Sequence, residues 1–141
     1  MSHVQVVGAA IVDSLASPKK LLAGRRSAPA ALAGLWEFPG GKVENNESHE
    51  AALLRELHEE LGVQVRLGEE IVGPDAERGW PLKPGVSMRV WAVSVQAGTP
   101  RALQDHDQLR WLALDDALVG AVPWIPADEV IVEALVEQLG R

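Results

Sequence analysis

Residues 41–63 constrain this chain more than any other stretch, because they combine a glycine turn with a short acidic helix. Within them, residues 55–60 read RELHEE, so the carboxylates of Glu56, Glu59 and Glu60 stand at positions i, i+3 and i+4. On an α-helix turning about 100° per residue, these three fall within a sector of roughly 100°. The leucines of the same segment centre about 130° away, so one face can dock on a core while another carries the charges.

Local signals mark the ends of this helix. Asn46 or Ser48 is expected at its N-cap, since a side-chain oxygen there accepts hydrogen bonds from unpaired backbone N–H groups. Gly62 suits the C-terminal end, where the chain often turns left-handed. Before the helix, the Pro-Gly-Gly sequence of residues 39–41 predicts a turn whose backbone can approach another group closely.

Three like charges at helical spacing destabilise a helix unless something neutralises them. Hard divalent cations do so through carboxylate oxygens, and Mg²⁺ prefers such ligands. A backbone carbonyl of Gly40 or Gly41 is a further candidate ligand for the same cation. The pattern therefore predicts a divalent-cation site, with a solvated acidic helix face as the alternative interpretation.

The rest of the chain predicts an α/β protein. Its 141 residues suit a single domain that spans residues 1–141. Apolar or alternating runs predict strands or extended segments over residues 4–12, 21–26, 35–38, 63–72, 86–95 and 109–114. A last helix is expected over about 129–139, with Asp128 at its N-cap. Residues 73–85, rich in Pro and Gly, are expected to form a loop or a hairpin tip.

Composition narrows the class of partner. Thirteen basic against 20 acidic residues give a formal net charge of −7, which disfavours a nucleic-acid polymer or an anionic membrane. The chain has no cysteine, so it forms no disulfide and uses no thiolate chemistry. It shows no signal sequence and no apolar run of about 18 residues. We expect a cytoplasmic protein that acts on a small molecule, as a monomer or a homodimer.

Residues 41–63 resemble the Nudix box. That pattern is Gly, five residues, Glu, seven residues, Arg-Glu, an apolar residue, any residue, Glu-Glu, any residue, Gly and an apolar residue. This chain matches it with Gly41, Glu47, Arg55, Glu56, Leu57, Glu59, Glu60, Gly62 and Val63. Seven identities at about one in fifteen each make a chance match of the order of one in 10⁸ per window. The resemblance implies the Nudix fold, an α/β/α sandwich with a mixed β-sheet between the box helix and a C-terminal helix.

The resemblance also implies roles for the residues of the box. The cofactor would be Mg²⁺, or alternatively Mn²⁺. Its ligands would be Glu56, Glu59, Glu60 and a carbonyl of Gly40 or Gly41. Arg55 would orient the glutamate side chains rather than bind substrate. The structural members of the box would be Gly41, Glu47 and Gly62.

Outside the box, several positions resemble those of MutT-type members of the family. Arg26 matches an arginine that contacts the nucleotide, and Glu37 matches a glutamate close to the metal site. Asp105 matches a glutamate that a loop brings to the metals, with Asp107 as the alternative. The same loop carries an imidazole, and these groups are candidates for a metal-proximal acid or a general base.

Recognition of the base is expected at Asp128. Its segment, IPADE, resembles a MutT segment whose asparagine reads oxidised guanine, and relatives acting on cytidine triphosphate or oxidised guanine carry an aspartate there. A carboxylate accepts hydrogen bonds from cytosine N4 or from guanine N1 and N2. Met88 and Trp91 are further candidates to flank a base, with core packing as the alternative.

Together these resemblances imply a Mg²⁺-dependent nucleoside triphosphate pyrophosphohydrolase that releases a nucleoside monophosphate and pyrophosphate. Oxidised dGTP (8-oxo-dGTP) and (d)CTP derivatives both fit, and the MutT likeness favours sanitation of the nucleotide pool. Two alternatives stay open. One is a Nudix hydrolase of ADP-ribose or dinucleoside polyphosphates, and the other is a non-catalytic ligand-sensing Nudix domain, which the intact glutamates of the box disfavour.

Overall fold

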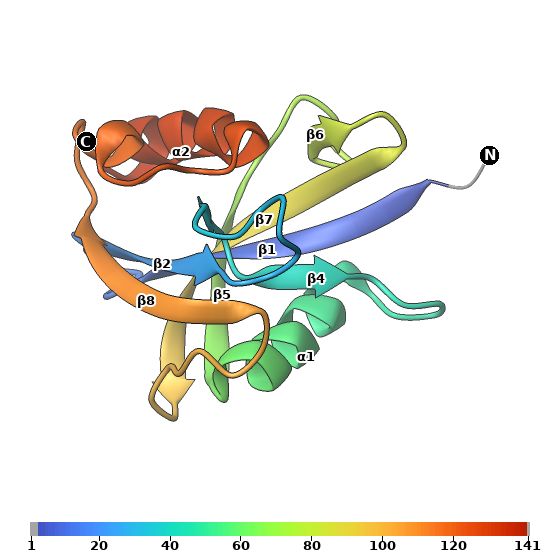
Figure 1. Ribbon diagram of the computed structural model, residues 1–141, viewed down its shortest axis with the longest axis horizontal. Coiled ribbons are helices and arrows are strands. Elements are labelled where there is room, and N and C mark those ends of the chain that lie inside the picture. Colours follow the sequence, from blue (N-terminus) through green and yellow to red (C-terminus); the bar gives the residue numbers. More distant parts are fainter. Residues whose placement is uncertain (1–2, 141) are drawn as a thin grey trace.

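A mixed β-sheet lies between two helices in the computed structural model, which describes residues 3–140 (Figure 1). The strands are β1 (Val4–Val12), β2 (Lys20–Arg26), β3 (Trp36–Glu37), β4 (Gly40–Lys42), β5 (Gln64–Ile71), β6 (Trp80–Lys83), β7 (Val86–Ala97) and β8 (His106–Ala113). The helices are α1 (His49–Leu61) and α2 (Pro126–Leu139), with a short 3-10 helix η1 (Leu118–Gly120) before α2. The expected α/β/α sandwich is confirmed.

The central strand β1 pairs with two different strands along one of its edges. Strands β3, β2, β1, β7 and β5 follow one another across the sheet, with β1 and β7 parallel and the other pairs antiparallel. Along one edge, β1 pairs with β2 at residues 11–12 and with β4 at residues 6–8. Because β4 replaces β2 as the partner of β1, the short β3–β4 connection runs across the end of β2. The glycines of the predicted turn, Gly40 and Gly41, follow this connection and lie in β4 itself.

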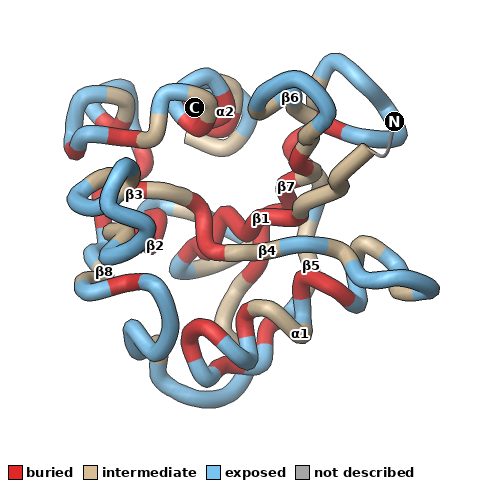
Figure 2. The backbone as a smooth tube through the Cα atoms, turned by 45° about the vertical axis from the view of Figure 1, so that its right-hand side comes forward, coloured by how far each residue is buried: buried red, intermediate tan, exposed pale blue. Residues whose placement is uncertain are grey.

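The two faces of the sheet carry separate cores, because successive side chains of a strand point to opposite faces. Leu53, Leu57 and Leu61 of α1 pack on one face, and Ile131 and Leu135 of α2 pack on the other. Buried residues accordingly run along β1 and along the inner sides of both helices (Figure 2).

Met88 and Trp91 belong to opposite cores, Met88 to that of α2 and Trp91 to that of α1. An odd spacing along β7 separates the two side chains by the thickness of the sheet. The idea that both flank one base is therefore wrong, and Trp91 packs in the core.

The ends of α1 agree with the sequence, and the start of α2 does not. Ser48 Oγ accepts a hydrogen bond from Ala51 N at 3.1 Å, and Gly62 ends α1 in the left-handed region with φ 72°. In contrast, α2 begins at Pro126, so Asp128 lies inside its first turn and is not the N-cap. Proline suits the first helical position because the missing N–H has no intrahelical partner there.

The segment of residues 73–85 contains β6, which pairs antiparallel with β7 and so forms a hairpin. This agrees with the hairpin-tip interpretation and places β6 beside β7 and against α2 (Figure 1). Within residues 3–140, neither helix combines the length and apolar character that a membrane crossing requires.

Candidate active site

Glu60 is the buried carboxyl of the box helix, with 4% of the residue exposed. Its Oε1 accepts a hydrogen bond from Gly40 N at 2.9 Å, which joins α1 to β4. Burial raises the pKa of Glu60 to about 7, and the nearby carboxylates of Glu37 and Glu56 add to the rise, while His106 opposes it. A charged Glu60 therefore needs more positive charge than its surroundings supply.

Arg55 gathers the other acidic side chains of the box. Its Nε and Nη2 donate to Glu47 at 2.8 and 2.9 Å, and its Nη1 donates to Glu56 at 2.8 Å and to Glu59 at 3.4 Å. Nη2 also donates to the carbonyl of Lys42 in β4, at 3.0 Å. The hydrogen bonds from Arg55 lower the pKa of Glu47 to about 2. Arg55 thus holds the acidic face of α1 against the end of β4.

The two glycines of β4 are required by close packing on both sides of the strand. A Cβ on Gly40 would clash with the backbone carbonyl of Val7 in β1. A Cβ on Gly41 would clash with the carboxyl group of Glu56. The sequence-based prediction of a close backbone approach therefore holds, although residues 40–42 form a strand rather than a turn.

The acidic groups beside β4 fit the predicted divalent cation in their chemistry. Glu56, Glu59 and Glu60 offer carboxylate oxygens, the ligands that Mg²⁺ prefers. Desolvation raises the pKa of Glu56 as well, so a nearby cation would stabilise its charged form. Within residues 3–140, no three acidic or histidine side chains already converge as a metal-binding group. Arg55 draws Glu56 and Glu59 to itself, and Gly40 N–H holds Glu60.

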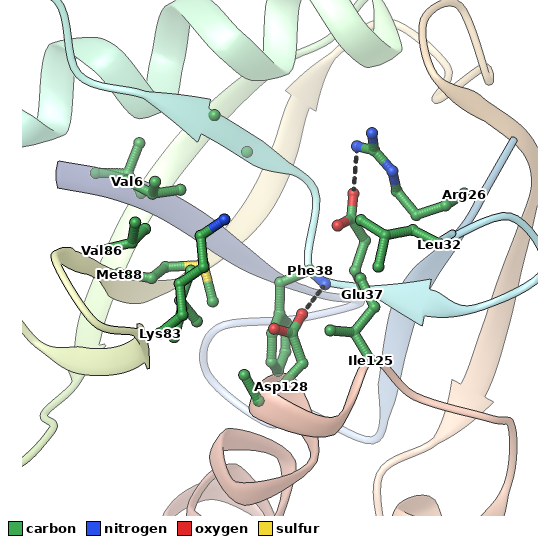
Figure 3. Close-up of a pocket in the computed structure, with 15 residues that line it drawn as sticks. Val6, Arg26, Leu32, Glu37, Phe38, Lys83, Val86, Met88, Ile125 and Asp128 are labelled. Atoms are coloured by element: carbon green, nitrogen blue, oxygen red, sulfur yellow. Dashed lines mark hydrogen bonds and ion pairs between the residues drawn. The ribbon is translucent and has the colours of Figure 1, made fainter. Parts of the chain in front are cut away.

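A cavity of about 340 Å³ borders the same two glycines (Figure 3). Its walls are mainly apolar and come from β1, β6, β7 and the start of α2, with Leu32 from the loop after β2. The charged side chains of its lining are Arg26, Glu37, Lys83 and Asp128. Lys83 was not singled out from the sequence, because the strand β6 that brings it to the cavity is short and contains a proline.

Asp128 is a buried carboxyl of the cavity lining, beside Phe38 and Ile125, with 5% of the residue exposed (Figure 3). Its Oδ2 accepts a hydrogen bond from Phe38 N at 3.2 Å (Figure 3), and the Phe38 ring stacks on Trp124 with centroids 6.0 Å apart. Burial raises the pKa of Asp128 to about 7. The charge of Glu37 adds to this rise, so Asp128 is a partly protonated carboxyl at neutral pH.

Arg26 and Glu37 of the cavity lining form a connected group with His106, which lies outside the lining. Arg26 Nη1 donates to Glu37 Oε2 at 3.2 Å, and His106 Nε2 lies 2.9 Å from the same oxygen. His106 Nδ1 lies 3.0 Å from the carbonyl of Gln104. The pKa of His106 is raised: desolvation lowers it, but the hydrogen bond to Glu37 and the charges of Glu37 and Glu60 outweigh that effect.

The sequence named the imidazole of His106 only together with Asp105 and Asp107, as a candidate for a metal-proximal acid or a general base, and did not predict its burial beside Glu37. The signal that could have selected it is its position at the start of a strand, between two aspartates. Its burial in the site depends on the pairing of β8 with β2, which sequence alone does not give.

The two candidate loop carboxylates, Asp105 and Asp107, lie outside the cavity lining. Asp107 accepts a hydrogen bond from Arg25 Nε at 2.7 Å, in an exposed ion pair. Asp105 is exposed and left-handed, with φ 56°, and its carbonyl accepts from Ser27 N at 2.9 Å. The structure thus places Arg26, Glu37 and Asp128 in the cavity lining, and Glu56 and Glu60 against the glycines of β4. A role for Asp105 or Asp107 beside the metal stays a prediction.

Known proteins are similar to this chain in sequence and in fold. Residues 3–135 match the NUDIX domain family model. The chain is 38% identical over 134 residues to the CTP pyrophosphohydrolase of Escherichia coli (strain K12), covering 95% of this chain and 92% of that protein. It is 56% identical over 41 residues to the 8-oxo-dGTP diphosphatase of Proteus vulgaris, covering 29% of this chain and 37% of that protein. The solution structure of the E. coli ORF135 protein superposes with a TM-score of 0.76 at 34% identity, covering 100% of this chain and 94% of that one.

Proposed function

This chain belongs to the Nudix hydrolase family, and on that premise we propose that it is a Mg²⁺-dependent nucleoside triphosphate pyrophosphohydrolase. Its products would be a nucleoside monophosphate and pyrophosphate. The observation that carries the proposal is the position of β4. The backbone of Gly40 and Gly41 borders both the carboxylates of α1 and the cavity that contains Asp128. A triphosphate bound along β4 would therefore have its phosphates near the acidic helix and its base in the cavity.

Hydrolysis of a phosphoanhydride depends on neutralising charge and on aligning the attacking water and the leaving group. Mg²⁺ held by Glu56, Glu59 and Glu60 would neutralise the phosphoryl oxygens and acidify a water molecule. Arg55 would hold the glutamates in place through the hydrogen bonds described above. The hydrogen bond from Gly40 N–H would fix the buried Glu60 between α1 and the cavity that Gly40 borders.

The cavity supports a substrate whose base carries an amino group. Asp128 is the buried carboxyl of its lining, and one of its oxygens accepts a hydrogen bond from Phe38 N–H. The other oxygen would accept a hydrogen bond from cytosine N4, or from guanine N1 and N2. We therefore propose (d)CTP derivatives and 8-oxo-dGTP as the substrates. The names of the two relatives described above support the same two classes.

A panel of substrates tests the proposal. Pyrophosphate release would be measured with Mg²⁺ for CTP, dCTP, 8-oxo-dGTP, dGTP and dTTP, with ADP-ribose as a substrate of another type. We expect the highest kcat/KM for a cytosine or oxidised-guanine triphosphate and the lowest for dTTP, whose base has no amino group. Asp128→Ala should remove this ranking while leaving dTTP turnover unchanged. Equal activity on all triphosphates would remove the base-reading role, and activity on ADP-ribose alone would replace the proposal.

A further inference from the structure

We propose that His106 is a positioning residue, which holds the Glu37 carboxylate so that Arg26 stays available to bind a phosphate oxygen of the substrate. The proposal rests on the function proposed above, because it requires an anionic substrate in the cavity. His106 itself does not line the cavity, whereas Arg26 and Glu37 do.

The His106 ring is fixed on every side. Its side chain is completely buried, and its two nitrogens lie 2.9 Å from Glu37 Oε2 and 3.0 Å from the Gln104 carbonyl. Both partners accept hydrogen bonds, so each ring nitrogen is placed to donate one. Gly24, in the neighbouring β2, leaves room for the ring, since a Cβ there would lie 2.8 Å from His106 Cδ2.

Glu37 is held by groups from two neighbouring strands. Its Oε2 receives Arg26 Nη1 from β2 at 3.2 Å as well as His106 Nε2 from β8. The side chains of Arg26 and Glu37 are only 17% and 15% exposed. The hydrogen bond from His106 therefore fixes the orientation of the Glu37 carboxylate relative to the Arg26 guanidinium.

Arg26 keeps donors free for a ligand in this arrangement. Its Nε and Nη2 both donate to the Ala28 carbonyl, and Nη1 donates to Glu37 (Figure 3 shows the latter). A guanidinium has five N–H groups, so one remains on each terminal nitrogen. Such a pair matches the oxygens of a phosphate. Without His106, the Glu37 carboxylate could turn and accept hydrogen bonds from both of these N–H groups, as carboxylates do in bidentate pairs with arginine. It would then compete with the substrate phosphate for Arg26.

Two substitutions distinguish the roles of the two ring nitrogens of His106. In His106→Gln the amide nitrogen replaces Nε2 and can still donate to Glu37, whereas in His106→Asn it replaces Nδ1 and can reach only Gln104. We expect KM for the preferred triphosphate to rise about tenfold in His106→Asn and to stay within about threefold in His106→Gln, with kcat changed less than KM in both. His58→Asn, at an exposed histidine of α1, is the matched control and should change neither constant.

A second background tests whether the effect passes through Glu37. In Glu37→Ala the Glu37 carboxylate is absent and cannot compete for Arg26. The double variant Glu37→Ala/His106→Asn should therefore have the same KM as Glu37→Ala alone. Thermal unfolding of every variant identifies loss of structure. If His106→Asn does not fold, the KM of His106→Gln is the test. A tenfold rise in the KM of folded His106→Gln would overturn the proposal.

An unchanged KM in folded His106→Asn, or independent effects of the two substitutions, would overturn the positioning role alone. Wild-type protein that hydrolyses no nucleoside triphosphate with Mg²⁺ would overturn the proposed function and this role with it.

Discussion

Glu60 and Asp128 are buried carboxyls, and each accepts one backbone N–H, from Gly40 and Phe38 respectively. Burial raises the pKa of both groups to about 7. A buried carboxyl that is kept charged lowers the free energy of unfolding. Such groups occur mainly where a ligand or a reaction requires them. At the scale of single residues, these two positions are therefore where stability and function oppose each other.

Asp128→Asn should stabilise the protein at neutral pH. The pKa of Asp128 is about 7 in the folded state and 3.8 in an unperturbed chain, so the folded state binds the proton more tightly. The stabilisation by that proton is complete below about pH 4 and is lost as pH rises through 7. Wild type should thus match the variant at pH 4 and fall behind by up to about 4 kcal/mol above pH 7. Denaturant unfolding at several pH values measures this difference, and a constant difference would contradict it.

Glu59→Gln should lower kcat by about 100-fold or more, because it removes a proposed metal ligand from the acidic face of α1. The Glu59 side chain is 45% exposed, so the unfolding temperature should stay near that of wild type. Glu133→Gln is the matched control, since it makes the same change at an exposed position of α2. Comparable kcat values for the two variants would show that Glu59 is not a ligand.

At the scale of elements, the position of β4 between β1 and α1 makes its two glycines unequal. Gly40→Ala would meet the backbone of β1, which cannot move aside, and should destabilise the protein by about 1–3 kcal/mol or more. Gly41→Ala would meet the end of the Glu56 side chain, which can rotate. It should cost less stability but lower kcat, because Glu56 is displaced. Thermal unfolding and turnover of both variants test this, and the reverse order would contradict the account.

Much of the fold was predictable because local patterns and packing agree. The helix of the box has its apolar stripe, its Ser48 cap and its Gly62 end in one continuous segment, and each signal acts within a few residues. The strands of the core follow from apolar or alternating runs. The start of α2 was not predicted correctly, because Asp128 is a good N-cap by type and yet is drawn inward by Phe38 N–H.

The parts of the site that the sequence missed depend on pairing between distant strands. His106 comes close to Glu37 because β8 and β3 both pair with β2, across 69 residues of chain. Lys83 reaches the cavity because β6 folds back on β7. The sequence indicated a loop or hairpin tip at residues 73–85 and a polar loop before β8, but it did not give the strand register. It could not show that Lys83 reaches the cavity or that His106 is buried beside Glu37.

At the scale of the whole molecule, an acidic protein has to bind an acidic substrate. The formal net charge is −7, and a nucleoside triphosphate is also strongly negative. A divalent cation between them reconciles the two charges. We therefore expect Mg²⁺ and a non-hydrolysable triphosphate analogue together to raise the unfolding temperature by several degrees, and each alone to raise it much less. An equal effect of the analogue without Mg²⁺, in the presence of a chelator, would contradict this coupling.

The central claim is that the acidic face of α1 and the cavity beside β4 together cleave a nucleoside triphosphate with the help of a divalent cation. ³¹P NMR of the products formed from the preferred triphosphate tests it most directly. With Mg²⁺ we predict equal amounts of nucleoside monophosphate and pyrophosphate, and with a chelator no turnover. Nucleoside diphosphate with orthophosphate, or the same turnover in the presence of the chelator, would contradict the account.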